Sequence, residues 1–167
     1  MSTLIKNKRI VADPWQTLSP EESPAAAPLP EGDILFPLSV WQLRRNEIIS
    51  SHKRIGLWLE PDTDLAPLEA DLQYFVVIAI NFPKFADGRG YSLARLLRER
   101  YHYEGEIRAT GDVLHDQLFL MQRVGFDAWA LKDGKDAAQA LEAFATFKTP
   151  YQGAVDEPLP LFRRRTP

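Results

Sequence analysis

The 167-residue sequence contains no cysteine. This absence excludes disulfides, thiolate nucleophiles and cysteine-ligated iron–sulfur clusters. The sequence also lacks a Walker loop, a GxGxxG fingerprint and a GxSxG elbow. Nucleotide-dependent and hydrolase mechanisms therefore lose their usual sequence support. We therefore expect no bound cofactor, and a redox role would depend on electrons supplied by another protein.

A basic surplus and a long apolar run are missing as well. The net charge is -3, whereas binding to a phosphate backbone normally needs a strong excess of Lys and Arg, so no nucleic-acid partner is expected. No apolar run approaches the roughly 20 residues that cross a bilayer, and the first residues carry no signal-peptide pattern. These absences predict a cytoplasmic protein without a membrane contact. His52, His102 and His115 show no recognisable metal-ligand spacing, so no metal site is expected.

The distribution of proline suggests three segments. Residues 15–32 are rich in proline and cannot form a helix interior or a central strand. We therefore predict an N-terminal arm and proline-rich linker over 1–33, a single α/β domain over 34–148, and an extended C-terminal tail over 149–167. Trp15 in the arm is the tryptophan expected to form an exposed contact, whereas the terminal Arg163–Arg165 run is expected to be solvated.

Short apolar runs alternate with helical patterns in the central segment. The helices are expected from about Ser39 to Ile49, from Ser92 to Tyr101, along Leu114 to Gly125, and after Asp136. Strands that alternate with helices predict a parallel sheet of about five strands, with an open doubly wound sheet favoured over half of a βα barrel completed by self-association. The predicted strands are 34–36, 55–59, 75–80, 106–109 and 128–131.

The connection from Phe82 to Tyr91 is longer than a usual strand-to-helix loop and lies where α/β sheets bind ligands. Gly88 and Gly90 could adopt left-handed backbone angles before a helix beginning at Ser92, and so expose amides to a small oxyanion. An ordinary turn and an N-cap are the favoured alternative for these glycines and Ser92. The side chains expected at this edge of the sheet are Asn81, Lys84, Asp87, Arg89, Thr110, Asp112 and Lys132, and Lys84, Arg89 and Arg108 would supply positive charge to the anion.

Acidic residues supply the candidate catalytic groups. Asp112 most simply caps the helix that follows it, and Asp116 would complement the helix dipole in the first turns. The functional alternative makes Asp112 or Asp116 a general base near Lys84 or Arg89, and Asp87 is a further acid/base candidate.

Three runs of the sequence resemble a known family. They are Phe82–Arg95, Gly105–Gln117 and Gly125–Ala128, and they are similar to a bacterial family named as domain of unknown function 934. The resemblance covers roughly Ile34 to Phe147. The family often has Cys where this chain has Val124 and Arg where it has His115, which argues against an essential redox cysteine or catalytic histidine.

The resemblance implies a role in sulfate assimilation, because members are typically encoded beside the sulfite reductase hemoprotein and are often labelled oxidoreductases. The first hypothesis is an accessory protein that contacts sulfite reductase or its electron donor and holds sulfite or a related anion at Lys84, Arg89 and Arg108. An enzyme acting on a small anionic sulfur metabolite is the second, and a non-catalytic scaffold is the third.

Overall fold

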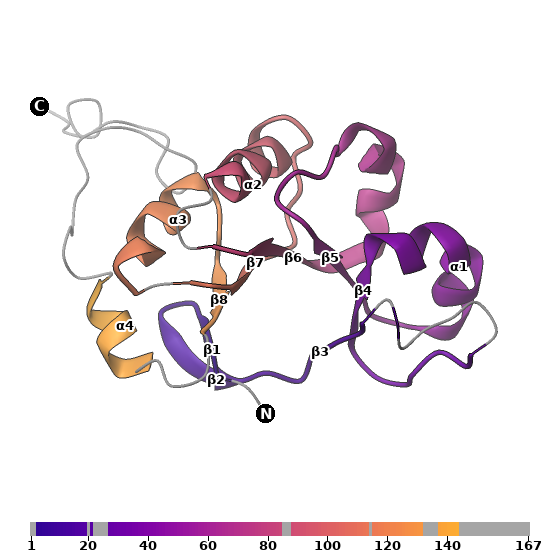
Figure 1. The fold of residues 1–167 in the computed structure, drawn as a ribbon, viewed down its shortest axis with the longest axis horizontal. Helices are drawn as coiled ribbons and strands as arrows, with labels where there is room; N and C mark the ends of the chain where they lie inside the picture. The colour runs from indigo at the N-terminus through magenta and orange to yellow at the C-terminus, as the bar shows by residue number, and fades with distance from the viewer. Residues whose placement is uncertain are drawn as a thin grey trace, which may run out of the picture.

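The computed structural model describes residues 3–19, 21, 27–84, 88–113, 115–131 and 137–143. Within these residues one α/β unit contains an eight-stranded sheet in the order β2-β1-β8-β7-β6-β5-β4-β3 (Figure 1). The strands are β1 (Thr3–Lys6), β2 (Arg9–Ala12), β3 (Gln16–Thr17), β4 (Ile34–Pro37), β5 (Ile55–Leu59), β6 (Phe75–Phe82), β7 (Glu106–Gly111) and β8 (Ala128–Ala130).

The helices lie between successive strands, except for the last, which follows β8. The α-helices are α1 (Leu38–Ser51), α2 (Arg89–Glu99), α3 (Leu118–Val124) and α4 (Ala137–Ala143), and the 3-10 helices are η2 (Ala66–Tyr74) and η3 (His115–Gln117). Each predicted helical pattern corresponds to one of the α-helices, although α2 begins at Arg89 rather than at Ser92. The 3-10 helix η2, which has Pro67 in its first turn, was not predicted.

Strand order corrects the favoured architecture. Strands β3 to β8 pair in parallel, each with the next along the chain, whereas β1 is antiparallel to both β2 and β8. A doubly wound sheet needs a point where the strand order reverses, and right-handed crossovers that all run one way place their helices on one face. The doubly wound prediction is therefore wrong. The mixed, curled sheet is a half-barrel, and it has eight strands rather than about five.

The helix-covered face of the sheet holds the larger core. Ile78, Ile80 and Phe82 alternate along β6 toward this face and are completely buried. Trp41 of α1 and Leu97 of α2 pack into the same cluster. Burying such apolar side chains is the main favourable term in folding, so this face accounts for most of the packing of the fold.

The opposite face carries a smaller apolar cluster, whose described members lie on strands or directly before β3. Leu35, Val77 and Ala79 project from the strands, and Trp58 packs against them at the margin. Trp15 covers this cluster and is only 7% exposed. The expectation that Trp15 forms an exposed contact is therefore wrong, because the chain folds back under the sheet before β3 begins.

A β-hairpin formed by β1 and β2 was missing from the sequence prediction. Asn7 and Lys8 connect the two strands with positive φ angles of 53° and 58°. A two-residue connection with both angles positive is the turn that fits the twist of a hairpin. Since β1 also pairs with β8, residues 3–17 are part of the sheet rather than an arm outside the domain. The C-terminal tail lies outside the described residues.

None of the helices in the described segments is long and apolar enough to cross a membrane.

Candidate functional site

An open depression of about 490 Å³ lies where the carboxyl ends of β6, β7 and β8 meet. The side chains and backbone that define it are Asn81, Phe82, Thr110, Gly111, Asp112 and Leu131. The sequence placed Asn81, Thr110 and Asp112 at this edge, and the structure brings the three residues together there. Lys132, which was expected beside them, is outside the described residues.

Hydrogen bonds hold the polar groups of the depression in place. Asn81 and Thr110 are register partners on neighbouring strands. The Asn81 side-chain amide donates to a carboxylate oxygen of Glu60 at 3.2 Å, and the Asp112 backbone N–H donates to the Phe82 carbonyl at 2.7 Å. The Asn81 side chain and the Asp112 backbone are therefore held in place before any ligand arrives.

Gly111 makes this arrangement possible. Its φ is 89°, a backbone conformation that favours glycine, and a Cβ at this position would lie 2.5 Å from both the Asn81 side-chain oxygen and the Phe82 carbonyl oxygen. Sequence reasoning overlooked Gly111. The signal was the Thr110-Gly111-Asp112 run directly after a predicted strand, a typical place for a residue with a positive φ.

The other glycines of the loop differ from their prediction. Gly88 is at the N-cap of α2 with φ -78° and ψ -10°, so it is not left-handed. Gly90 is buried inside the first turn, where a Cβ would lie 2.6 Å from the Phe82 ring. Close packing of helix on strand therefore explains Gly90. Ser92 lies within the helix and is exposed, so its predicted position at the helix start is wrong.

The predicted cations do not converge on one point. Lys84 and Arg89 are exposed, and neither lines the depression. An Arg89 guanidinium nitrogen lies 3.9 Å from an Asp62 carboxylate oxygen. Asp87, between them in the sequence, falls outside the described residues.

Arg108 lies elsewhere, in a buried ionic cluster with Asp13, Glu106 and Lys6. Its guanidinium is 1% exposed and donates to both Asp13 carboxylate oxygens at 2.9 Å and to Glu106 at 2.9 Å. The Lys6 ammonium lies 2.7 Å from the second Glu106 oxygen. Two carboxylates thus compensate the arginine, which does not project into the depression. The guanidinium donates to Asp13 and Glu106 instead, so the prediction that Arg108 binds an anion at that edge is wrong.

The candidate acids occupy different environments. Asp112 lines the depression and is partly buried, whereas Asp116 is exposed in η3. Helix α3 begins at Leu118 with Gln117 at its N-cap, so Asp112 is not the cap of that helix. Burial, and secondarily the charge of Asp116, raises the pKa of the Tyr91 phenol, which packs against Phe82.

The depression therefore combines a side-chain amide, a hydroxyl and a carboxylate with apolar lining residues such as Phe82 and Leu131. Such a mixture can bind small polar molecules, because a few placed polar groups set the orientation of a ligand. Among the residues that the structure describes, no group of three His, Asp or Glu side chains is arranged to hold a metal ion.

Comparison with known proteins places the chain in a family of unknown function. No curated protein and no solved structure matches the chain significantly. A family model matches residues 56–162, so the match begins later than the similarity noticed in the sequence and runs further toward the C-terminus. The model covers more than half of the chain, which therefore belongs to the family described as bacterial proteins of unknown function (DUF934).

Proposed function

We propose that this protein is a cytoplasmic accessory protein of assimilatory sulfate and sulfite reduction that associates with sulfite reductase and binds a small ligand at the edge formed by β6, β7 and β8. The observation that carries the proposal is the preformed depression, in which Asn81, Thr110 and Asp112 are fixed by strand register and by the Gly111 turn. The resemblance to proteins encoded beside sulfite reductase supports the choice of pathway. The lack of cysteine supports an accessory role over a cysteine-based electron carrier.

A small sulfur oxyanion is the proposed ligand. Its support is two exposed cations between β6 and the first turn of α2: Lys84, which follows the lining residue Pro83, and Arg89, the first residue of α2. Asp112 opposes an anion inside the depression, so the charged end of the ligand belongs at the rim, on the side where Lys84 follows Pro83.

Growth of a deletion strain tests this function. The strain is grown on sulfate, sulfite, sulfide or cysteine and complemented with wild type, the double variant Lys84→Ala/Arg89→Ala, or the control Arg95→Ala, which removes an exposed cation from α2. We expect failure on sulfate and sulfite, rescue by sulfide, and no complementation by the double variant. Normal growth of the deletion strain on every source contradicts the pathway, and full complementation by the double variant contradicts the rim site.

A second candidate function is catalysis on a small anionic sulfur metabolite. It is favoured by the position of Asp112, which is partly buried and lines the depression as a general base would. Asp112→Asn separates the two functions. Loss of complementation with unchanged folding and unchanged reductase binding supports an enzyme, whereas full complementation leaves the accessory role or a scaffold.

A further inference from the structure

The edge of the sheet formed by β2 is open. Strand β2 is the terminal strand of the sheet, and all four of its residues are exposed (Figure 1). Within the residues that the structure describes, β2 pairs with β1 and with no other strand. Ile10 is 49% exposed and Val11 is 37% exposed, so two β-branched side chains reach solvent at this edge. An exposed edge strand is a template on which another extended segment can pair.

The register of the β1–β2 hairpin shows which main-chain groups are available. In an antiparallel pair joined by two residues, the pair next to the turn, Lys6 and Arg9, is hydrogen-bonded, and such pairs alternate with pairs that are not. Ile10 and Ala12 belong to the alternate pairs, so their N–H and C=O groups point away from β1. In the described part of the chain these outward groups have no hydrogen-bond partner. Two N–H and two C=O groups can therefore pair with an added strand.

The edge also carries positive charge that the fold does not compensate. Lys6 and Arg9 are register partners, so two cations lie directly opposite each other on one face of the hairpin, an arrangement that is destabilising. The Lys6 ammonium lies 2.7 Å from a Glu106 carboxylate oxygen. Arg9 is exposed, and no acid among the described residues pairs with it. An acidic side chain from a partner would relieve this repulsion.

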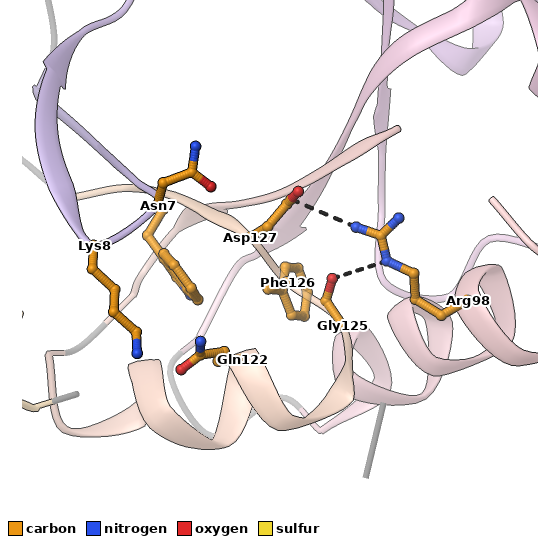
Figure 2. Close-up of a pocket in the computed structure, with 8 residues that line it drawn as sticks. Asn7, Lys8, Arg98, Gln122, Gly125, Phe126 and Asp127 are labelled. Atoms are coloured by element: carbon orange, nitrogen blue, oxygen red, sulfur yellow. Dashed lines mark hydrogen bonds and ion pairs between the residues drawn. The ribbon is translucent and has the colours of Figure 1, made fainter. Parts of the chain in front are cut away.

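Lys8 adds a second cation at the same end of β2. It lies in the turn, and Figure 2 shows its side chain extending from the hairpin without an ion pair to the other residues drawn. Asp127, which lines the same cavity, lies 3.6 Å from a guanidinium nitrogen of Arg98 instead. The chain as a whole has a net charge of -3, so two neighbouring cations without an acid make this edge locally basic. Charge complementarity therefore favours an acidic partner.

We propose that β2 binds an extended acidic segment of a partner protein, which adds a strand to the open edge. The main chain of the segment pairs with Ile10 and Ala12. An acidic side chain lies opposite Arg9, and an apolar side chain two positions away lies opposite Val11, because residues two apart in a strand share a face. The residue between them contacts Ile10 on the other face. The segment is therefore recognised by an acid and an apolar residue separated by one position.

A second copy of this chain fits the edge less well than an acidic segment. It would bring another Lys8 and another Arg9 to the interface, and like charges there oppose association. Residues 7–12, which form the turn and β2, contain no acidic residue that could compensate them. Basic side chains on an edge strand are a common means by which sheets avoid pairing with themselves.

Nuclear magnetic resonance titration of the isotope-labelled full chain tests the proposal. The probes are two peptides blocked at both ends, Ser-Glu-Ile-Val-Thr-Ser and Ser-Thr-Val-Ile-Glu-Ser, whose orders serve parallel and antiparallel addition. The control peptides carry lysine in place of glutamate. We expect at least one acidic peptide to bind with a Kd of about 1 mM or below, and its lysine control to bind at least about tenfold more weakly. The largest amide shifts should be those of Ile10 and Ala12.

Three outcomes of this titration overturn the proposal. They are the absence of binding by both acidic peptides up to about 5 mM, the largest shifts at residues outside the hairpin, and equal binding of an acidic peptide and its lysine control.

Matched variants assign the charge and the main-chain groups. Arg9→Gln removes one half of a like-charge pair, so the chain should fold while peptide binding weakens at least about fivefold. The control Arg95→Gln removes an exposed cation from α2 and should leave the Kd within about twofold. Ile10→Pro removes an outward N–H but no bond to β1, so binding should be lost while the fold is retained. Equal losses in the two arginine variants, or unchanged binding by Ile10→Pro, contradict the assignment.

Sedimentation of the unliganded chain tests the alternative occupant. We expect wild type and Ile10→Pro to sediment alike. A dimer that Ile10→Pro dissociates would assign this edge to a second copy and overturn the proposal. Because these measurements report binding at β2 and not growth, their result is independent of the test of the depression.

Discussion

The two faces of the sheet are closed by different chemistry. On the helix-covered face, strand residues such as Ile78 and Ile107 pack against α1, α2 and α3 in one apolar cluster. On the opposite face, Val77 and Ala79 lie beside the buried cluster of Arg108, Asp13 and Glu106. Elements adjacent in the sequence build the first face, whereas the second is closed by a segment 95 residues away from Arg108.

The two faces differ in how strictly their packing specifies the segment that covers them. Apolar packing is tolerant of exchange, since side chains of similar volume replace one another at small cost. A buried ionic cluster has no such tolerance, because removal of one partner leaves the remaining charges in a poorly solvating interior. The second face therefore determines the position of the N-terminal segment more strictly than an apolar patch would.

The largest expected effect on stability comes from the buried ionic cluster on the face opposite the helices. Arg108→Met should lower the free energy of unfolding by about 3–5 kcal/mol, because Asp13 and Glu106 stay buried without the guanidinium. Arg95→Met is the control, since Arg95 forms an exposed pair with Glu99 and should cost less than about 1 kcal/mol. Urea unfolding measures both variants. Equal losses would mean that the buried cluster contributes no more than a surface pair.

The next effect is on the helix-covered face. Gly90→Ala should destabilise by about 1–3 kcal/mol, because the added Cβ meets the Phe82 ring at 2.6 Å. Gly88→Ala is the matched variant. It has φ -78° and no atom within 4 Å of the new Cβ, so we expect a change of less than about 1 kcal/mol, because the N-cap preference for glycine over alanine opposes the entropic gain. If urea midpoints move equally for both, close packing is not the reason for glycine at 90.

A smaller effect is expected from one buried hydroxyl. Tyr103→Phe removes the hydrogen bond from the phenol to the Phe75 carbonyl at 3.0 Å and should cost about 0.5–1.5 kcal/mol at neutral pH. Burial raises the pKa of Tyr103 well above its usual range. Above about pH 10 the unfolded chain releases this proton first, so wild type should lose stability relative to the variant as pH rises. A difference that does not change with pH would contradict a buried, protonated phenol.

The smallest expected effect on stability comes from Asp127, which directly precedes β8. Burial raises the pKa of the Asp127 carboxyl, so the folded state retains this proton to a higher pH than the unfolded chain does. Wild type should therefore lose stability relative to Asp127→Asn as pH increases from about 3 to about 7, measured by urea unfolding at each pH. The opposite slope would show that the Arg98 charge outweighs desolvation.

Local patterns in the sequence predicted the parallel strands closely. Strand β5 covers the predicted residues 55–59, and β6 extends its prediction by two residues to Phe82. The β1–β2 hairpin escaped prediction because its apolar pairs, Leu4-Ile5 and Ile10-Val11, are too short to show a period. The edge that holds the depression was predicted because carboxyl ends of parallel strands always meet there, but Gly111 was overlooked and Gly90 was assigned the wrong role.

The sequence by itself determined the α/β class, the five central parallel strands and the edge that carries Asn81, Thr110 and Asp112. Hydrophobic periodicity and turn residues act over a few positions, so they can be recognised without knowledge of distant contacts. Only the tertiary structure decided the half-barrel, the burial of Trp15 and the pairing of Arg108 with Asp13. These features depend on which distant segment fills the space beside a strand, and packing of the whole chain selects that segment.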